Sequence, residues 1–198
     1  MDNLLSKSDQ SGTTAYSYDP ADNLKTVTDP YSQRTSFGYD QDDQETSRTY
    51  PNGVVESSGY DGAGDLTSIG ARSRVNPQLT NYRYGYVNPA SNQMTDQRYS
   101  MIDYVTGHTS TYSYNALSRL TGVSQPWSGS GGNYAYGYDN NGNMTSSAFG
   151  GATSTNMTYN NVDQLTTSTA PGNPTYGYDA NGNQLSVSGG NSQSYNWL

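Results

Sequence analysis

The residues that could carry out chemistry in this 198-residue chain are few and scattered. The single histidine, His108, could in principle join a Ser-His-Asp triad, but no Gly-x-Ser-x-Gly nucleophile elbow accompanies it. The carboxylates form no local pair either, because the only glutamates are Glu45 and Glu56 and the aspartates are dispersed. Glycoside hydrolysis needs two carboxyl groups about 5–9 Å apart. We therefore expect a solvated loop histidine and no enzymatic activity.

Two polar loops resemble the opening of a calcium-binding loop, residues 139–143 (Asp-Asn-Asn-Gly-Asn) and 179–183 (Asp-Ala-Asn-Gly-Asn). An EF-hand needs a bidentate Glu at its twelfth position, where these loops have Gly150 and Gly190. A structural interpretation explains the same residues, because Asp can cap a turn and Asn-Gly supplies the positive φ that tight turns require. We expect no bound metal and no cofactor.

Trp127, in the Gly- and Ser-rich stretch 125–132, is the best single candidate for binding a glycan. An aromatic ring can stack on a sugar while neighbouring amides form hydrogen bonds to its hydroxyl groups. Tyrosines that recur at regular intervals are first expected to order a sheet. A carbohydrate-binding adhesive module is therefore the alternative function and not the main one.

Composition and charge exclude several other classes. The chain has no cysteine, which rules out disulfides, thiolate zinc sites and a cysteine nucleophile. Only nine Lys and Arg residues stand against 17 Asp and Glu, and the basic residues form no cluster, so we expect no nucleic-acid partner. No apolar run approaches the roughly 18 residues of a membrane span. Leu, Ile, Val and Phe number 23, too few for a conventional aliphatic core.

The elements that must position these residues come from a repeat, aromatic-x-aromatic-Asp followed by a turn and then Asn-Leu or a near equivalent. Its second aromatic recurs every 19 to 28 residues along the chain. The expected ladder aromatics are Tyr16, Tyr18, Phe37, Tyr39, Tyr60, Tyr84, Tyr86, Tyr112, Tyr114, Tyr136, Tyr138, Tyr159, Tyr176, Tyr178, Tyr195 and Trp197. The expected turn residues are Asp19, Asp40, Asp61, Asp139, Asp179, Gly142, Asn143, Gly182 and Asn183.

Each repeat predicts a β-hairpin. Two aromatics separated by one residue point to the same face of a strand, because side chains alternate along it. A second run rich in β-branched residues follows each turn, as in Leu24–Thr28 and Leu120–Val123. No stretch sustains a helical period, so the fold class is all-β, with antiparallel hairpins stacked in tandem. Tyrosine can replace the missing aliphatics, because each ring buries about 150–250 Å².

The whole chain resembles the YD-repeat region of rearrangement-hotspot (RHS) proteins, teneurins and the shell components of insecticidal toxin complexes. The residues that carry this resemblance are motifs such as 136–143 (Tyr-Gly-Tyr-Asp-Asn-Asn-Gly-Asn) and 176–183. The resemblance implies hairpins stacked into a spiralling sheet, shell or tubular solenoid. It also implies a passive structural role, outside the cell or at its surface. The family's terminal core region, which is linked to self-cleavage of a toxin domain, has no counterpart in this sequence, so we carry over no protease or toxin activity.

Residues 1–198 are expected to form a single array of eight to nine units with half-motifs at both ends. Val87 and Asn115 stand where Asp is expected, which makes the register of the central units the least regular. Asn3-Leu4 matches Asn23-Leu24, so the first unit is expected to hold only the part of the motif that follows the turn. The last residues, Tyr195-Asn196-Trp197-Leu198, supply only the aromatic part. Two interpretations stay open: a segment of a longer RHS protein, or a subunit that associates head to tail into a filament by strand addition.

Overall fold

The computed structural model describes residues 3–127, 132–189 and 193–194. The described residues form β-strands and turns with no helix, as the sequence predicts. The expected all-β class is thereby confirmed. Consequently, no helix in these ranges is long and apolar enough to cross a membrane. The chain divides into two compact units, Met1–Thr109 and Ser110–Leu198.

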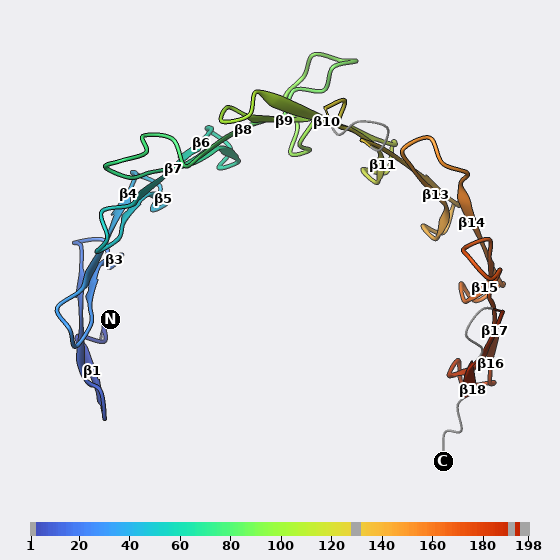
Figure 1. The fold of residues 1–198 in the computed structure, drawn as a ribbon, viewed down its shortest axis with the longest axis horizontal. Helices are drawn as coiled ribbons and strands as arrows, with labels where there is room; N and C mark the ends of the chain where they lie inside the picture. The colour runs from blue at the N-terminus through green and yellow to red at the C-terminus, as the bar shows by residue number, and fades with distance from the viewer. Residues whose placement is uncertain (1–2, 128–131, 190–192, 195–198) are drawn as a thin grey trace. The chain divides into compact units, whose positions relative to one another are not determined.

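The first unit is a single antiparallel sheet in which each strand pairs with the next one along the sequence. Its strands are β1 (Ser6–Asp9), β2 (Gly12–Tyr18), β3 (Leu24–Thr28), β4 (Arg34–Tyr39), β5 (Glu45–Thr49), β6 (Val55–Tyr60), β7 (Leu66–Arg72), β8 (Thr80–Gly85) and β9 (Ser100–Asp103). Figure 1 shows these strands in one layer, with no second layer over either face.

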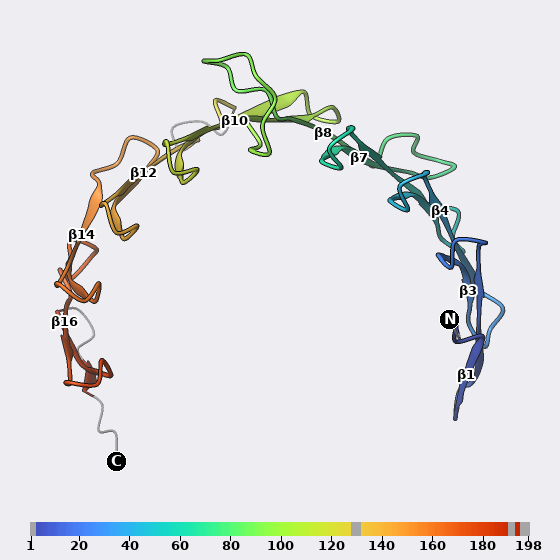
Figure 2. The same cartoon turned by 180° about the vertical axis from the view of Figure 1, so that it is seen from behind.

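The second unit has the same organisation. Its strands are β10 (His108–Tyr114), β11 (Leu120–Ser124), β12 (Asn133–Tyr138), β13 (Met144–Phe149), β14 (Thr155–Tyr159), β15 (Leu165–Ser168), β16 (Thr175–Tyr178), β17 (Gln184–Ser188) and β18 (Gln193–Ser194). The view from behind in Figure 2 shows again a single layer of consecutive hairpins.

The register gives each sheet two different faces. Residues that oppose each other across an antiparallel pair point to the same side. Tyr16 opposes Val27 and Tyr18 opposes Leu24, so aromatic and aliphatic side chains share one side, which we call the aromatic face. A bulge places one extra residue next to the turn on the second strand, here Lys25. It keeps the second tyrosine and the leucine opposite each other.

The other side, which we call the small-residue face, carries short side chains. Its opposing pairs are Ser17–Thr26, Gly38–Ser47, Gly59–Ser68, Gly85–Ser100, Ser113–Gly122, Gly137–Ser146, Thr158–Thr167 and Gly177–Ser186. A Cβ at Gly38 would lie 2.5 Å from Ser47 Oγ, and one at Gly59 would lie 2.7 Å from Ser68 Oγ. Glycine is therefore favoured just before the second aromatic of the repeat, because the opposing serine leans into its space.

Burial is modest, as a single layer requires. Among the hydrophobic residues described, Tyr86 alone is buried, with 7% of its surface exposed, whereas Phe149 is 50% exposed. Most aromatic-face side chains are half-buried against their neighbours along the sheet. No compact interior forms in either unit, so the sheets must be held by contacts between successive hairpins.

Candidate functional site

In seven repeats the second aromatic, a tyrosine, binds its own hairpin to the one before it. Its hydroxyl donates a hydrogen bond to the carbonyl at or near the start of the second strand of the preceding hairpin. The pairs, all between 2.9 and 3.1 Å, are Tyr18–Leu4, Tyr39–Leu24, Tyr60–Glu45, Tyr86–Leu66, Tyr138–Leu120, Tyr159–Met144 and Tyr178–Leu165. We call this repeated contact the tyrosine latch. Burial raises the pKa of Tyr39 and Tyr159, so both phenols stay protonated as donors.

The Asp that follows the second tyrosine shapes the turn. Asp19 Oδ1 accepts hydrogen bonds from the backbone N–H of Ala21 and Asn23, both 2.9 Å. The backbone closes the same turn through Asp22 N–H to Asp19 O and Asp19 N–H to Asn23 O. This is a three-residue hairpin loop, a type I turn followed by a residue with positive φ. The pattern recurs at Asp40, Asp61 and Asp179.

Asparagine can replace this Asp. Asn115 Oδ1 accepts from Leu117 and Arg119, so the central unit with Asn in place of Asp keeps a regular turn. Val87 does not substitute in this way. Instead it forms a bridge with Met94, and the turn begins one residue later, where Asn88 Oδ1 accepts from Ala90 N–H. The turn of that unit is therefore shifted by one residue along the chain.

The positive φ falls on a single residue of each loop and not on an Asn-Gly pair. Gly142 and Gly182 have φ of 102° and 87°, whereas Asn141 and Asn181 do not lie in that region. Elsewhere the same position is filled by Asp22, Asp43, Gly64, Ser118 and Asp163. The expectation that the Asn-Gly pairs supply the positive φ therefore holds for glycine alone, because a type I turn with a bulge needs one such residue and a type I′ turn needs two.

A second contact joins successive turns and was not foreseen from the sequence. Where the positive-φ residue is Asp, an Asn from the preceding turn donates to its carboxylate. These pairs are Asn3–Asp22 at 2.8 Å, Asn23–Asp43 at 2.5 Å and Asn143–Asp163 at 2.7 Å. We call it the turn clasp. The only sequence signal is an Asn followed by an Asp 19 or 20 residues later.

Where the positive-φ residue is glycine, the preceding turn carries a longer side chain. A Cβ at Gly64 would lie 3.0 Å from Gln44 Nε2, and one at Gly182 would lie 3.3 Å from Gln164 Nε2. Arg119 reaches furthest and donates to the carbonyl of Asp139 at 2.9 Å. A short amide thus meets an aspartate, and a long side chain extends over a glycine.

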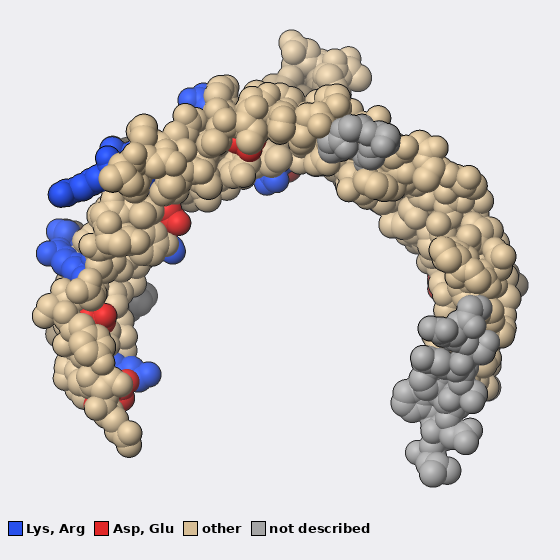
Figure 3. Space-filling model, in the orientation of Figure 1, with Lys and Arg blue, Asp and Glu red and all other residues tan. Residues whose placement is uncertain are grey.

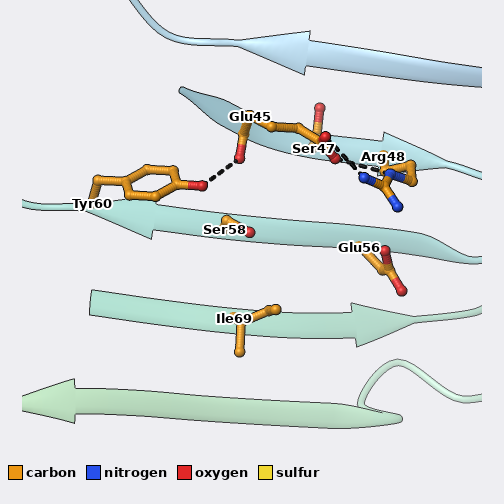
Figure 4. Close-up of a pocket in the computed structure, with 7 residues that line it drawn as sticks. All are labelled: Glu45, Ser47, Arg48, Glu56, Ser58, Tyr60 and Ile69. Atoms are coloured by element: carbon orange, nitrogen blue, oxygen red, sulfur yellow. Dashed lines mark hydrogen bonds and ion pairs between the residues drawn. The ribbon is translucent and has the colours of Figure 1, made fainter. Parts of the chain in front are cut away.

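One part of the aromatic face is polar. A cavity of about 280 Å³ on β5 to β7 contains both glutamates of the chain, with Arg48 beside them. Figure 4 shows Glu45 between Tyr60 and Arg48, with Glu56 on the next strand. Arg48 donates to both oxygens of Glu45, at 3.0 and 2.9 Å, and its guanidinium lies 5.2 Å from the centre of the Phe37 ring.

The charged side chains around this cavity form hydrogen bonds with one another and with Tyr50. Tyr50 donates to Glu56 Oε2 at 2.9 Å and accepts from Arg48 Nη1 at 3.4 Å. The bonds with Glu45, followed by the one with Tyr50, raise the pKa of Arg48, which keeps the guanidinium charged. Both carboxylates are already hydrogen-bonded, so the arrangement suits a structural link between β5 and β6. Sequence reasoning missed it because it treated the two glutamates as unrelated.

The remaining predicted residues are dispersed. The expectation of a solvated loop histidine is wrong, because His108 is half-buried as the first residue of β10. Trp127 lies in a turn after β11. The loops 139–143 and 179–183 are hairpin turns, and no group of three or more His, Cys, Asp or Glu residues that could hold a metal occurs in the described part of the chain. Tyr195 and Trp197 lie outside the described residues. The other predicted aromatics lie on the aromatic faces of their units.

An aromatic cavity lies on the second unit. Tyr134 and Tyr136 stack with an interplanar angle of 12°, and the Phe149 ring is 4.7 Å from that of Tyr134. These rings line a cavity of about 310 Å³. It is the part of the second unit that comes nearest to a platform for a flat ligand.

The tyrosine latch, the capped turns and the single-layer sheet can be compared with known proteins. In solved structures the chain is similar to TcdB2-TccC3-Cdc42, with a TM-score of 0.62 and 18% identity over 93% of this chain and 12% of that chain. It is also similar to TcdB2-TccC3 without its hypervariable C-terminal region, with a TM-score of 0.61 and 17% identity over 93% of this chain and 11% of that chain. These likenesses show the fold, and the chain spans only about an eighth of either structure.

The comparison with curated proteins finds no match. Family models match the sequence over most of its length. The RHS repeat model matches residues 2–33 and 18–55, and the teneurin YD-shell model matches residues 91–197, more than half of the chain. The chain therefore belongs to the teneurin YD-shell family.

Proposed function

We propose that the chain is wall material, a run of hairpins that forms part of a larger β-shell outside the cytoplasm or at the cell surface. The observation that carries this proposal is the tyrosine latch, because in seven repeats it commits a tyrosine side chain to the neighbouring hairpin. In the polar cavity on the aromatic face described above, Arg48 likewise spends its hydrogen bonds on Glu45 and Tyr50 of the same sheet. The family and the fold likeness to the TcdB2-TccC3 structures support the same role.

A wall must continue beyond each unit, and β1 offers an edge for this. β1 pairs with β2, and all four of its residues are exposed. Such an edge is a template for another strand. We propose that a second copy or a neighbouring repeat pairs here, which includes head-to-tail assembly into a filament.

The ladder geometry allows a specific test. Tyr16 N–H donates to Leu5 O, and hydrogen-bonded pairs alternate along an antiparallel ladder. Ser8, opposite Thr13, is therefore in a non-hydrogen-bonded position with its N–H directed away from β2. Ser8→Pro should block the open edge without breaking the β1–β2 ladder. Lys7→Pro, one residue away, should break that ladder and serves as the contrasting variant.

Association is measured by analytical ultracentrifugation and electron microscopy over rising protein concentration. We expect elongated assemblies for the wild-type chain, and monomers with an unchanged circular dichroism spectrum for Ser8→Pro. Wild-type particles that stay monomeric at high concentration would exclude self-assembly and leave a segment of a longer RHS wall. Assemblies that persist in Ser8→Pro would exclude β1 as the edge.

The second candidate is glycan adhesion, favoured by the aromatic cavity of Tyr134, Tyr136 and Phe149 and by Trp127 in the same unit. Retention on immobilised neutral glycans tests it. Trp127→Ala and Phe149→Ala should each abolish retention if these rings bind sugar. Unchanged retention in both variants would remove this candidate, and Tyr138→Ala should impair folding under either function.

A further inference from the structure

A cavity of about 380 Å³ lies over β6, β7 and β8 of the first unit. Its lining includes Ser57, Ser68, Arg72, Gln78, Asn81 and Arg83. The strand positions among these residues belong to the small-residue face, on the side opposite the Glu45–Arg48 network. We propose that this cavity binds an oligosaccharide that carries carboxylate or sulfate groups. The proposal does not depend on the wall function.

An enlarged loop builds one side of the cavity. Regular connections such as residues 29–33 and 50–54 have five residues, whereas seven residues separate β7 from β8. Ser73 N–H donates to Asn76 O at 2.7 Å, and Gln78 N–H donates to Asn76 Oδ1 at 3.0 Å. These bonds order the loop and hold Pro77 and Gln78 beside the sheet, where they line the cavity. The regular connections bring no such wall to this face.

The charge around the cavity is opposite to that of the molecule. The chain has a formal charge of −8, yet residues 66–83 contain three arginines and no Asp or Glu. No carboxylate of the described residues lies within ion-pair distance of Arg72 or Arg83. The Arg83 guanidinium rests 5.7 Å from the centre of the Tyr104 ring. Figure 3 shows Lys and Arg side chains gathered over the first unit.

The register sets the length of the ligand. Ser68 opposes Arg83, and Arg72 lies four residues further along β7. At about 3.3 Å per residue, the two arginines start roughly 13 Å apart along the strand. Gly70 and Asn81 lie between them as an opposed pair, and Gly70 adds no side chain to the middle of the cavity. A single small anion engages both arginines only when their side chains bend toward each other, whereas a chain of sugar units with spaced acidic groups engages both while the side chains stay apart.

The groups between the arginines favour a saccharide. Ser57 and Ser68 contribute hydroxyl groups, and Gln78 and Asn81 contribute amides. Hydroxyls and amides both donate and accept hydrogen bonds, as the hydroxyl groups of a sugar require. No aromatic ring lines the cavity, which disfavours nucleic-acid bases, because these bind single-stranded sites by stacking.

The test uses the full chain and isothermal titration calorimetry at two salt concentrations. The probes are a sulfated uronic-acid tetrasaccharide, the uncharged maltotetraose, inorganic sulfate and hexaglutamate. Arg72→Gln and Arg83→Gln should each weaken binding of the acidic tetrasaccharide about tenfold, since a charge-assisted hydrogen bond contributes about 1.4 kcal/mol or more. Gln78→Ala should weaken it severalfold. Both arginines are exposed, so thermal unfolding should be unchanged.

Arg34 provides the matched control, because it is exposed and opposes Thr28 on the same face but lies outside the cavity. Arg34→Gln should bind the tetrasaccharide as the wild type does. Equal weakening by Arg34→Gln would overturn the proposal in favour of diffuse charge attraction. Inorganic sulfate binding as tightly as the tetrasaccharide would reduce the site to a simple anion site, and hexaglutamate binding as tightly would replace the saccharide with an acidic peptide.

Discussion

At the scale of single residues, one hydroxyl distinguishes two tyrosines of the same motif. Tyr138 donates to Leu120 O at 2.9 Å, while Tyr136, two residues earlier on β12, lies against Tyr134 and forms no hydrogen bond through its hydroxyl with the described residues. Both side chains are half-buried on the aromatic face. The first tyrosine therefore contributes area and the second contributes area and a bond to the neighbouring hairpin.

Replacing each tyrosine by phenylalanine separates these contributions. Tyr138→Phe leaves the Leu120 carbonyl without its partner and should lower the free energy of unfolding by about 0.5–1.5 kcal/mol. Tyr136→Phe removes no hydrogen bond and should change it by less than about 0.5 kcal/mol. Urea unfolding followed by circular dichroism measures both. Equal losses in the two variants would show that the latch adds nothing to stability.

The turn aspartates make stability depend on pH. Hydrogen bonds from the Asn143 side chain lower the pKa of Asp139, and those from Asn183 lower the pKa of Asp179. A lowered pKa means that the folded chain binds a proton less readily than the unfolded chain, whose Asp titrates near about 3.9. The stabilisation is therefore present above that value and is lost as the pH falls through the folded pKa.

Asp139→Asn combined with Asp179→Asn should flatten this acid-side loss, because Asn keeps the acceptor oxygen but does not titrate. Asn160 already caps its turn in this way, accepting from Val162 and Gln164. The reverse change, Asn160→Asp, should steepen the loss. Urea midpoints between pH 2 and 6 provide the measurement, and identical pH profiles for wild type and both variants would contradict the assignment.

At the scale of the hairpin element, the sequence predicts the strands well and their connections only in part. The expected run Leu24–Thr28 coincides with β3, and the alternating aromatics place their residues on one face. The bulge at Lys25 was not foreseen, because it depends on the registry of two strands. The clasp between Asn143 and Asp163 was also missed, since neither residue type signals a partner 20 positions away.

The positive-φ position of the loop can be tested at glycines where no side chain would clash. A Cβ at Gly53, with φ of 81°, or at Gly62 would have no heavy atom within 4 Å, and Gly62 does not lie in the positive-φ region. Gly53→Ala should therefore cost about 1–2 kcal/mol through backbone strain alone. Gly62→Ala should be neutral or slightly stabilising. Similar effects in both variants would show that the left-handed residue does not limit the turn.

The clasp predicts that two positions must be exchanged together. Asp163→Gly removes the acceptor of both Asn141 and Asn143, which should destabilise the second unit by more than the relief of the positive φ at this residue stabilises it. Adding Asn143→Gln recreates the combination seen at Gln44 and Gly64, so the double variant should recover part of the loss. A double-mutant cycle from chemical unfolding should give a coupling of about 0.5 kcal/mol or more. Strict additivity would mean that the side chains do not interact.

At the scale of the whole molecule, stability comes from contacts between consecutive hairpins, because neither unit has a compact interior. The latch and the clasp both join a hairpin to its predecessor within a unit. Stability should then be close to a sum of hairpin and interface terms, as in other repeat proteins. A full period of the repeat can accordingly be removed without changing the environment of the residues that remain.

Deleting residues 19–39 removes 21 residues and joins Tyr18 to Asp40, which recreates the motif. Tyr16 then takes the place of Phe37 opposite Arg48, and Asp43 takes the place of Asp22 as the partner of Asn3. Because the slope of the free energy of unfolding against urea concentration scales with the surface exposed on unfolding, it should fall by about a tenth while the transition stays cooperative.

Deleting residues 19–38 is the contrasting variant, because it leaves one residue more and shifts the register, which sends Tyr16 and Tyr18 to the small-residue face. That variant should lose the order of β1 and β2, detected by hydrogen exchange. Equal behaviour of the two deletions would show that the period of the aromatic motif does not determine how the hairpins join.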